Sequence, residues 1–161
     1  MAMPATRFDI TTQSPEETAA LAEKIGQALR GGDTILLSGP IGAGKSHFCR
    51  HLIQSRLSTP EDVPSPTFTL VQIYEAADTE IWHSDLYRLA NAMDVEELGL
   101  FDAFETAICL VEWPDRLGDD TPENALTLSI ETFDSELEKR TFSLTWADPK
   151  WLDRLKELIN E

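Results

Sequence analysis

The sequence predicts an α/β fold of three layers, with a mixed parallel and antiparallel sheet flanked by helices. Residues 33–38 and Ala107–Glu112 are apolar enough to form buried strands, and the second run is as uniformly hydrophobic as a parallel strand covered on both faces. A third observation is a hairpin pattern, in which the segments 69–74 and 80–85 flank the turn Ala76–Thr79. The 161 residues suit one domain, 1–161, with a buried core.

The N-terminal part of the chain shows a strand and a helix before the central strand. Arg7–Ile10 is expected to form a short edge strand. A helix begins after it, with Ser14 as the N-cap, Pro15 at the first helical position and Glu17 completing a capping box. Apolar residues then recur at helical spacing as far as Gly31–Gly32, which we expect to end the helix.

The later elements follow similar patterns. A helix is expected from about Lys45 to Leu57, and one or two short helices are expected within Asp94–Glu105. Apolar and polar residues alternate around 126–130 and 142–146, which predicts two strands joined by a short turn. Asp148–Pro149 is expected to cap a final amphipathic helix, whose inward residues are Leu152, Leu155, Leu158 and Ile159.

The net charge of −16 narrows the classes of function. The 13 basic residues are scattered along the sequence, so a nucleic-acid surface would repel the chain and direct tRNA binding is disfavoured. The acidity either aids solubility or complements a basic protein partner, and the sequence leaves both open. No apolar run is long enough to span a membrane and residues 1–10 lack a signal-peptide pattern, which predicts a cytoplasmic protein with Cys49 and Cys109 as reduced thiols.

The segment Gly39–Ser46 has the pattern G-x-x-x-x-G-K-S between a strand and a helix, as the phosphate-binding loop of a nucleoside triphosphatase has. Its glycines allow a tight turn whose N–H groups approach phosphate oxygens, and the helix N-terminus adds partial positive charge. Lys45 is expected to contact the β- and γ-phosphates, and the Ser46 hydroxyl to bind Mg²⁺. The expected nucleotide-binding residues are Gly39, Pro40, Ile41, Gly42, Ala43, Gly44, Lys45, Ser46 and His47.

Two carboxylates and one hydroxyl extend this site. Glu112 ends a buried strand, and an acid at that place in phosphate-loop enzymes lies beside the loop and orders the Mg²⁺ shell. Asp85, which ends the strand 80–85, competes with it as a metal ligand or aligns water. Thr67 follows a proline-rich loop, where nucleotide switches reach the γ-phosphate. The expected metal ligands are Ser46, Glu112 and Asp85.

The helix after the loop also contains His47, Cys49 and His51, a set that suggests zinc. Only the two histidines share a helix face, and no carboxylate or second cysteine stands at ligand spacing. The sequence therefore favours helix packing or surface positions for these residues over a zinc site.

Four motifs occur in a fixed order: G-P-I-G-A-G-K-S at 39–46, S-P-T-F at 65–68, H-S-D-L-Y-R-L at 83–89 and E-W-P at 112–114. Together they resemble the bacterial TsaE (YjeE) family, ATPases needed for threonylcarbamoyladenosine modification of tRNA. The loop motif is shared with many families, whereas H-x-D-L-Y-R and E-W-P in this order are specific. The resemblance runs from about residue 14 to residue 113.

The resemblance implies a small P-loop NTPase-like domain with a partly antiparallel sheet, which binds ATP and Mg²⁺. Ser46 stands where the family usually has Thr, and Pro40 where it often has Asp; the metal-binding hydroxyl and the backbone cradle are kept. Family members act with TsaD and TsaB, which transfer the threonylcarbamoyl group, so the partners would meet the tRNA.

Carried over to this chain, the resemblance gives catalytic roles to Lys45, Asp85, Thr67 and Glu112. No arginine can be assigned as a finger, although Arg88 and Arg116 lie near the expected site. We therefore expect slow hydrolysis that the partners accelerate or gate. The rival functions are a small-molecule kinase, for which the sequence lacks an arginine-rich lid, and a nucleotide-sensing module that holds ATP without turnover.

Overall fold

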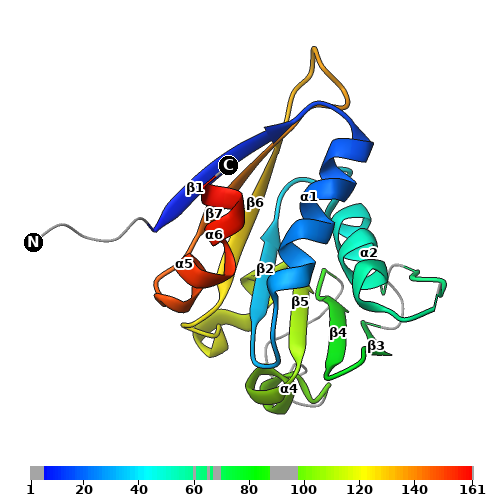
Figure 1. Ribbon diagram of the computed structural model, residues 1–161, viewed down its shortest axis with the longest axis vertical. Coiled ribbons are helices and arrows are strands. Elements are labelled where there is room, and N and C mark those ends of the chain that lie inside the picture. Colours follow the sequence, from blue (N-terminus) through cyan, green and yellow to red (C-terminus); the bar gives the residue numbers. More distant parts are fainter. Residues whose placement is uncertain (1–5, 60, 65, 67–69, 88–97, 161) are drawn as a thin grey trace, which may run out of the picture.

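The computed structural model describes residues 6–59, 61–64, 66, 70–87 and 98–160 (Figure 1). Within these residues, seven strands form one sheet in the order β1-β7-β6-β2-β5-β4-β3. The strands are β1 (Arg7–Thr12), β2 (Thr34–Ser38), β3 (Val71–Glu75), β4 (Glu80–Asp85), β5 (Ile108–Glu112), β6 (Leu126–Thr132) and β7 (Arg140–Thr145). Within the group β6, β2, β5 and β4, adjacent strands run parallel. Strand β7 is antiparallel to both β1 and β6, and β3 is antiparallel to β4, so the predicted mixed sheet is confirmed.

Helices cover both faces of the sheet and produce the predicted three layers (Figure 1). One face packs against α1 (Pro15–Ala28), α2 (Lys45–Arg56), α5 (Lys150–Arg154) and α6 (Lys156–Ile159). The other face packs against α4 (Leu100–Thr106) and the 3₁₀ segment η1 (Pro114–Asp120). Side chains of β2 alternate between the layers, because Ile35 and Leu37 join the first core whereas Leu36 joins the second.

Helix α1 begins as predicted but ends differently. The Ser14 hydroxyl accepts a hydrogen bond from the backbone N–H of Glu17 at 3.1 Å. The Glu17 carboxylate accepts from the N–H of Gln13 and not, as a capping box requires, from that of Ser14. The helix ends at Ala28, before the predicted glycine stop. Arg56 of α2 donates to the carbonyls of Gly26 and of the C-cap residue Leu29.

The prediction of one final helix is wrong, because the segment is divided into α5 and α6 at Leu155, where φ is −100° and ψ is 6°. Two anchored side chains account for the break. The buried Trp151 donates its indole N–H to the carbonyl of Asn124, and Arg154 donates to Asp33. These contacts hold α5 in a fixed orientation, which the helical spacing of the apolar residues alone does not determine. Leu155 and Leu158 are nevertheless buried, as predicted.

Both cysteines are buried free thiols, as the sequence predicts. Burial raises the pKa of Cys109 to about 12. Burial, together with the negative charges of Glu112 and Asp85, also raises the pKa of Cys49. Neither thiol is therefore activated as a nucleophile.

The helices that the structure describes include none that is both long and apolar enough to cross a membrane.

Candidate functional site

The glycine-rich loop lies at the edge of the sheet where the parallel strands β2, β5 and β4 end. It connects β2 to α2, and Gly42 and Gly44 have φ values of +83° and +103°. Side chains other than hydrogen are strained at such values. A Cβ atom at either glycine would meet no other atom within 4 Å, so these two residues face open space. The loop thus presents bare backbone to the solvent, as a phosphate cradle does.

A cavity of about 420 Å³ lies beside this loop and gathers most of the predicted site residues. Strand register explains the meeting of the two acids, because Asp85 at the end of β4 is paired with Glu112 at the end of β5. The cavity is lined by Ile41, Gly42, Gly44, Lys45, Ser46, His47, Asp85, Tyr87, Glu112 and Trp113. Thr67 and Arg88 lie outside the described residues.

Lys45 is buried and folded back onto its own loop. Its Nζ donates hydrogen bonds to the carbonyls of Gly39 at 2.6 Å and Pro40 at 2.9 Å. The same atom lies 4.2 Å from the centre of the Trp113 ring, within the range of a cation–π contact. Burial lowers the pKa of Lys45, and the nearby carboxylates partly offset this. The charge is thus held beside the cavity by neutral acceptors that an anion can replace.

Glu112 connects the loop to the floor of the site. Its two carboxylate oxygens each lie 3.1 Å from the hydroxyl of Ser46, which donates to them. The Oε2 atom of Glu112 also accepts a hydrogen bond of 2.6 Å from Nε2 of His83. Glu112 and His83 are only 2% and 1% exposed. A hydroxyl and a carboxylate, both hard oxygen donors, are therefore fixed side by side.

His83 was not predicted as a site residue from the sequence. With Nε2 donating to Glu112, its Nδ1 is buried and has no hydrogen-bond partner in the described part of the chain. The signal was present, since His83 and Asp85 stand two residues apart on β4 and so share a face of the sheet. Sγ of Cys49 belongs to the same buried group, in which one ligand atom from each of Cys49, His83 and Glu112 lies within 4.8 Å of the others.

Three further residues shape the site and were also missed. The rings of Tyr87 and Trp113 have centroids 4.8 Å apart and form one wall of the cavity. Trp113 has a left-handed backbone, with φ of 59°, at the junction between β5 and η1. Arg140 of β7 donates to the carbonyl of Ala43 at 2.8 Å and so supports the loop from the other side.

The remaining predicted residues are placed as follows. Asp85 accepts a hydrogen bond from the N–H of Tyr87 at 3.0 Å, which orients its carboxylate. His47 lines the cavity, and its Nε2 lies 3.2 Å from the carbonyl oxygen of Pro15. Its ring contacts that of His51 edge to face, with centroids 4.5 Å apart, whereas Cys49 is in the core.

A second, smaller cavity of about 180 Å³ lies on the opposite side of the loop. It shares the lining residues Gly44 and His47 with the first cavity, so the two cavities adjoin at the start of α2. Its walls come from α1 and from the turn before β7, and include the apolar side chain of Leu137, which is 78% exposed. The full lining is Pro15, Thr18, Ala43, Gly44, His47, Leu137, Glu138 and Arg140.

Comparison with known proteins gives consistent results. The model of the family described as "Threonylcarbamoyl adenosine biosynthesis protein TsaE" matches residues 12–142. Proteins named tRNA threonylcarbamoyladenosine biosynthesis protein TsaE are similar to this chain. That of Rickettsia conorii is 36% identical over 125 residues, covering 78% of this chain and 71% of the relative. That of Bacillus subtilis is 32% identical over 133 residues, covering 82% of each. The crystal structure of Bacillus subtilis YdiB superposes with a TM-score of 0.80 at 26% identity, covering 99% of this chain and 98% of that one.

Proposed function

Because this chain belongs to the TsaE family of tRNA threonylcarbamoyladenosine biosynthesis proteins, we propose that it is an ATPase acting with TsaD and TsaB. In this proposal the chain binds ATP with Mg²⁺ in the cytoplasm and hydrolyses it slowly alone. Hydrolysis supports the transfer of the threonylcarbamoyl group to tRNA adenosine by the partner pair. The acidic surface keeps the tRNA on the partners.

One observation carries the ATPase proposal. Lys45, Ser46 and Glu112 meet at one cavity beside a loop whose glycines leave backbone open to an anion. The Ser46 hydroxyl and the Glu112 carboxylate form an oxygen donor set, which suits Mg²⁺ better than a softer metal. These residues would hold the ion, which when bound neutralises phosphate charge and polarises the γ-phosphoryl group.

The protein's own residues supply the other parts of the reaction. Lys45 exchanges the carbonyls of Gly39 and Pro40 for phosphate oxygens, which are stronger acceptors because they are charged. Asp85, whose carboxylate is oriented by the N–H of Tyr87, would align the attacking water or join the metal shell. In this proposal the base of the nucleotide occupies the smaller cavity, which adjoins the first at Gly44 and His47.

The test is ATP turnover by the purified chain, measured alone and with the cognate TsaD–TsaB pair. We expect weak turnover that the pair changes by at least about tenfold. Turnover that the pair leaves unaltered would remove the proposed role with TsaD and TsaB and keep only the nucleotide site. Transfer of phosphate to a metabolite and not to water would instead favour the rival kinase function.

We assign His83 as a positioning residue for Glu112, and its replacement tests this. His83→Leu removes the donor 2.6 Å from the carboxylate, so the Mg²⁺ concentration for half-maximal turnover should rise about tenfold. His83→Gln can keep an N–H near the position of Nε2 and should restore most of the Mg²⁺ affinity. A loss of thermal stability in His83→Leu without a change in Mg²⁺ dependence would show a purely structural role.

Leu137→Ala tests the placement of the base. The side chain is exposed and lines the smaller cavity, so its loss should weaken ATP binding about three- to tenfold through lost apolar contact. Binding of inorganic tripolyphosphate, which has no base, should not change. Both affinities can be measured by calorimetry. Ile73→Ala, which removes a half-exposed apolar side chain from β3, is the control. Equal weakening of ATP and tripolyphosphate would place the base elsewhere.

A further inference from the structure

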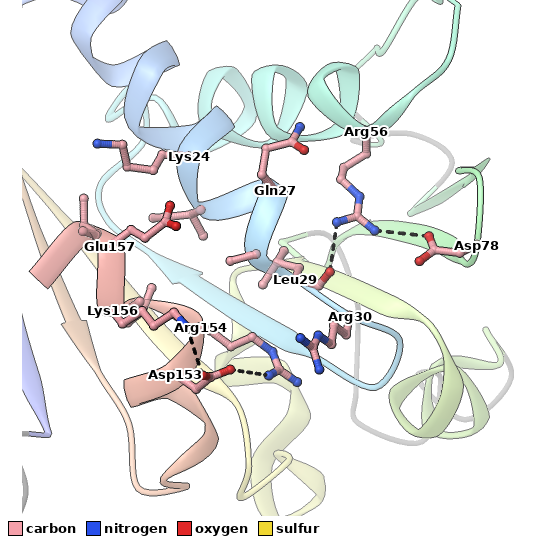
Figure 2. Close-up of a pocket in the computed structure, with 14 residues that line it drawn as sticks. Lys24, Gln27, Leu29, Arg30, Arg56, Asp78, Asp153, Arg154, Lys156 and Glu157 are labelled. Atoms are coloured by element: carbon pink, nitrogen blue, oxygen red, sulfur yellow. Dashed lines mark hydrogen bonds and ion pairs between the residues drawn. The ribbon is translucent and has the colours of Figure 1, made fainter.

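A third cavity, of about 380 Å³, lies far from the phosphate loop (Figure 2). Its walls come from the C-terminal half of α1 and from α5 and α6, with Arg56 of α2 and Asp78 of the β3–β4 turn on one side. Helix α1 starts beside the loop and ends at this cavity, and its 14 residues correspond to a length of about 21 Å. Residues of the candidate nucleotide site take no part in the lining.

The charge of this cavity is opposite to that of the protein. Its lining contains five of the chain's 13 lysines and arginines but only three of its 29 aspartates and glutamates. The cavity is thus net positive in a chain of net charge −16. The basic residues are Lys24, Arg30, Arg56, Arg154 and Lys156, and the acids are Asp78, Asp153 and Glu157. Such a concentration of cations raises the local concentration of small anions.

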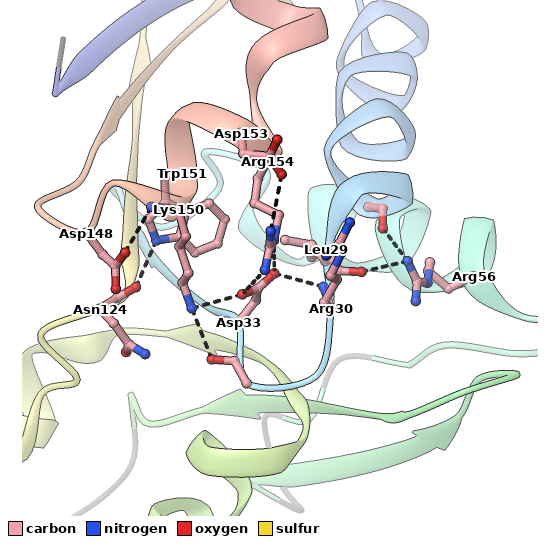
Figure 3. Close-up of polar contacts among 12 residues, drawn as sticks. Leu29, Arg30, Asp33, Arg56, Asn124, Asp148, Lys150, Trp151, Asp153 and Arg154 are labelled. Carbon is pink, nitrogen blue, oxygen red and sulfur yellow. Dashed lines mark hydrogen bonds and ion pairs between the residues drawn. The ribbon is translucent and has the colours of Figure 1, made fainter. Parts of the chain in front are cut away.

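The basic side chains differ in how far they are already neutralised. Arg154 donates to Asp33 and pairs with Asp153, and Arg56 donates to carbonyls of Gly26 and Leu29. Arg30, in contrast, makes no side-chain hydrogen bond or ion pair with any described residue, although its backbone N–H is bonded to Asp33. Figures 2 and 3 both show its guanidinium beside that of Arg154.

Two neighbouring guanidinium groups repel each other. Asp33 and Asp153 offset this charge at Arg154, whereas the side chain of Arg30 has no such carboxylate among the described residues, so an anion bound beside Arg30 would reduce the repulsion. The two guanidinium groups also form the fork that binds phosphate or carboxylate oxygens in pairs. Apolar residues complete the cavity, since Ile25, Leu29 and Leu158 line it and are buried in the core. The volume is near the lower end for ligand pockets, which suits a small molecule with a charged group and an apolar body.

We propose that this cavity is a second anion site that takes a small organic phosphate, with the phosphate on Arg30 and Arg154 and the apolar body against Leu29. A phosphomonoester matches the site because it carries a charge of about −1.5 to −2 and three acceptor oxygens at neutral pH. RNA is disfavoured, since a long polyanion would extend over the strongly acidic remainder of the surface.

The test is an NMR titration of the ¹⁵N-labelled chain with phenyl phosphate, which reports each backbone amide separately. We expect saturable shifts at Leu29, Arg30 and Arg154, in addition to any at the phosphate loop. Arg30→Ala should weaken binding at this cavity about tenfold, the effect of one lost charged hydrogen bond. Because Arg30 is exposed, the variant should keep the fold, and its unchanged spectrum elsewhere checks this.

Arg7→Ala is the matched control, because it removes the same charge from an exposed position on β1. Binding that Arg30→Ala weakens and Arg7→Ala does not would support the site, whatever happens at the phosphate loop. The proposed site would be overturned if only the amides of the phosphate loop shifted, or if both variants weakened binding equally. A short RNA that shifts Arg30 at lower concentration than phenyl phosphate does would overturn the assignment to a small molecule. Failure here leaves the ATPase proposal intact, since the two sites share no residue.

Discussion

Lys45→Ala is expected to lower the rate of ATP turnover about 10²–10³-fold, the effect of removing one preorganised charge donor from a transition state. Lys45 is the one lysine or arginine among the described residues that line the cavity with Ser46 and Glu112. Without it, the negative charge of the γ-phosphoryl group would face Glu112 and Asp85 with less compensation. Single-turnover hydrolysis of ATP, measured with saturating Mg²⁺, gives the rate directly.

Two controls make this result interpretable. Lys156→Ala removes an exposed lysine that pairs with Asp153, far from the phosphate loop, and should leave turnover unchanged. Lys45→Ala also loses the contacts to Gly39, Pro40 and Trp113, so its melting temperature must be compared with that of the wild type. A stable variant that hydrolyses ATP at the wild-type rate would contradict the role assigned to Lys45.

The parts of the fold that sequence predicts well are those fixed by local patterns. The run 108–111 is apolar throughout, and β5, which it begins, is completely buried between β2 and β4. Its end places Glu112 beside the glycine loop because the ends of parallel strands share one edge of a sheet. Asp85 was a candidate because it ends the strand 80–85, but the parallel pairing with β5 that brings it beside Glu112 was not predicted. The roles of both acids stay predictions.

The parts that sequence could not predict depend on contacts between distant segments. Arg140 supports the loop from a position 97 residues after Ala43, and no local pattern connects the two. His83 is hydrogen-bonded to a residue 29 positions away. One of the two contacts to which we attribute the division of the last helix, from Arg154 to Asp33, spans 121 residues. Such pairs are set by tertiary packing and cannot be read from periodicity.

Asp33→Ala is expected to lower the free energy of unfolding by about 3 kcal/mol. Asp33 is 1% exposed and joins the turn before β2 to α5, since Lys150 Nζ and Arg154 Nε lie 2.9 Å and 2.8 Å from its oxygens (Figure 3). It also accepts from the N–H of Arg30. Breaking a buried ion pair costs about 3–5 kcal/mol, and the partial exposure of the two cations favours the lower end. Urea unfolding at pH 7 measures the change.

The pH dependence of that loss distinguishes the charge of Asp33 from its packing. Burial acts to raise the pKa of Asp33, but hydrogen bonds from Arg154, Lys150 and the N–H of Arg30 outweigh it, so the pKa is below its ordinary value. A proton therefore binds more tightly in the unfolded state, and the stabilisation is complete above the unfolded pKa of about 3.9. This stabilisation is lost as the pH falls through the lower pKa that Asp33 has in the folded state.

Asp33→Asn, which keeps the shape of the side chain, should thus be much less stable than the wild type at pH 7, and the difference should shrink below about pH 4. Urea midpoints at several pH values give this comparison. Asp9→Asn is the matched control, because Asp9 pairs with Arg7 on the exposed surface of β1, where solvent screens the charges. A difference between Asp33→Asn and the wild type that stayed constant from pH 7 to pH 3 would show that packing, and not charge, makes Asp33 stabilising.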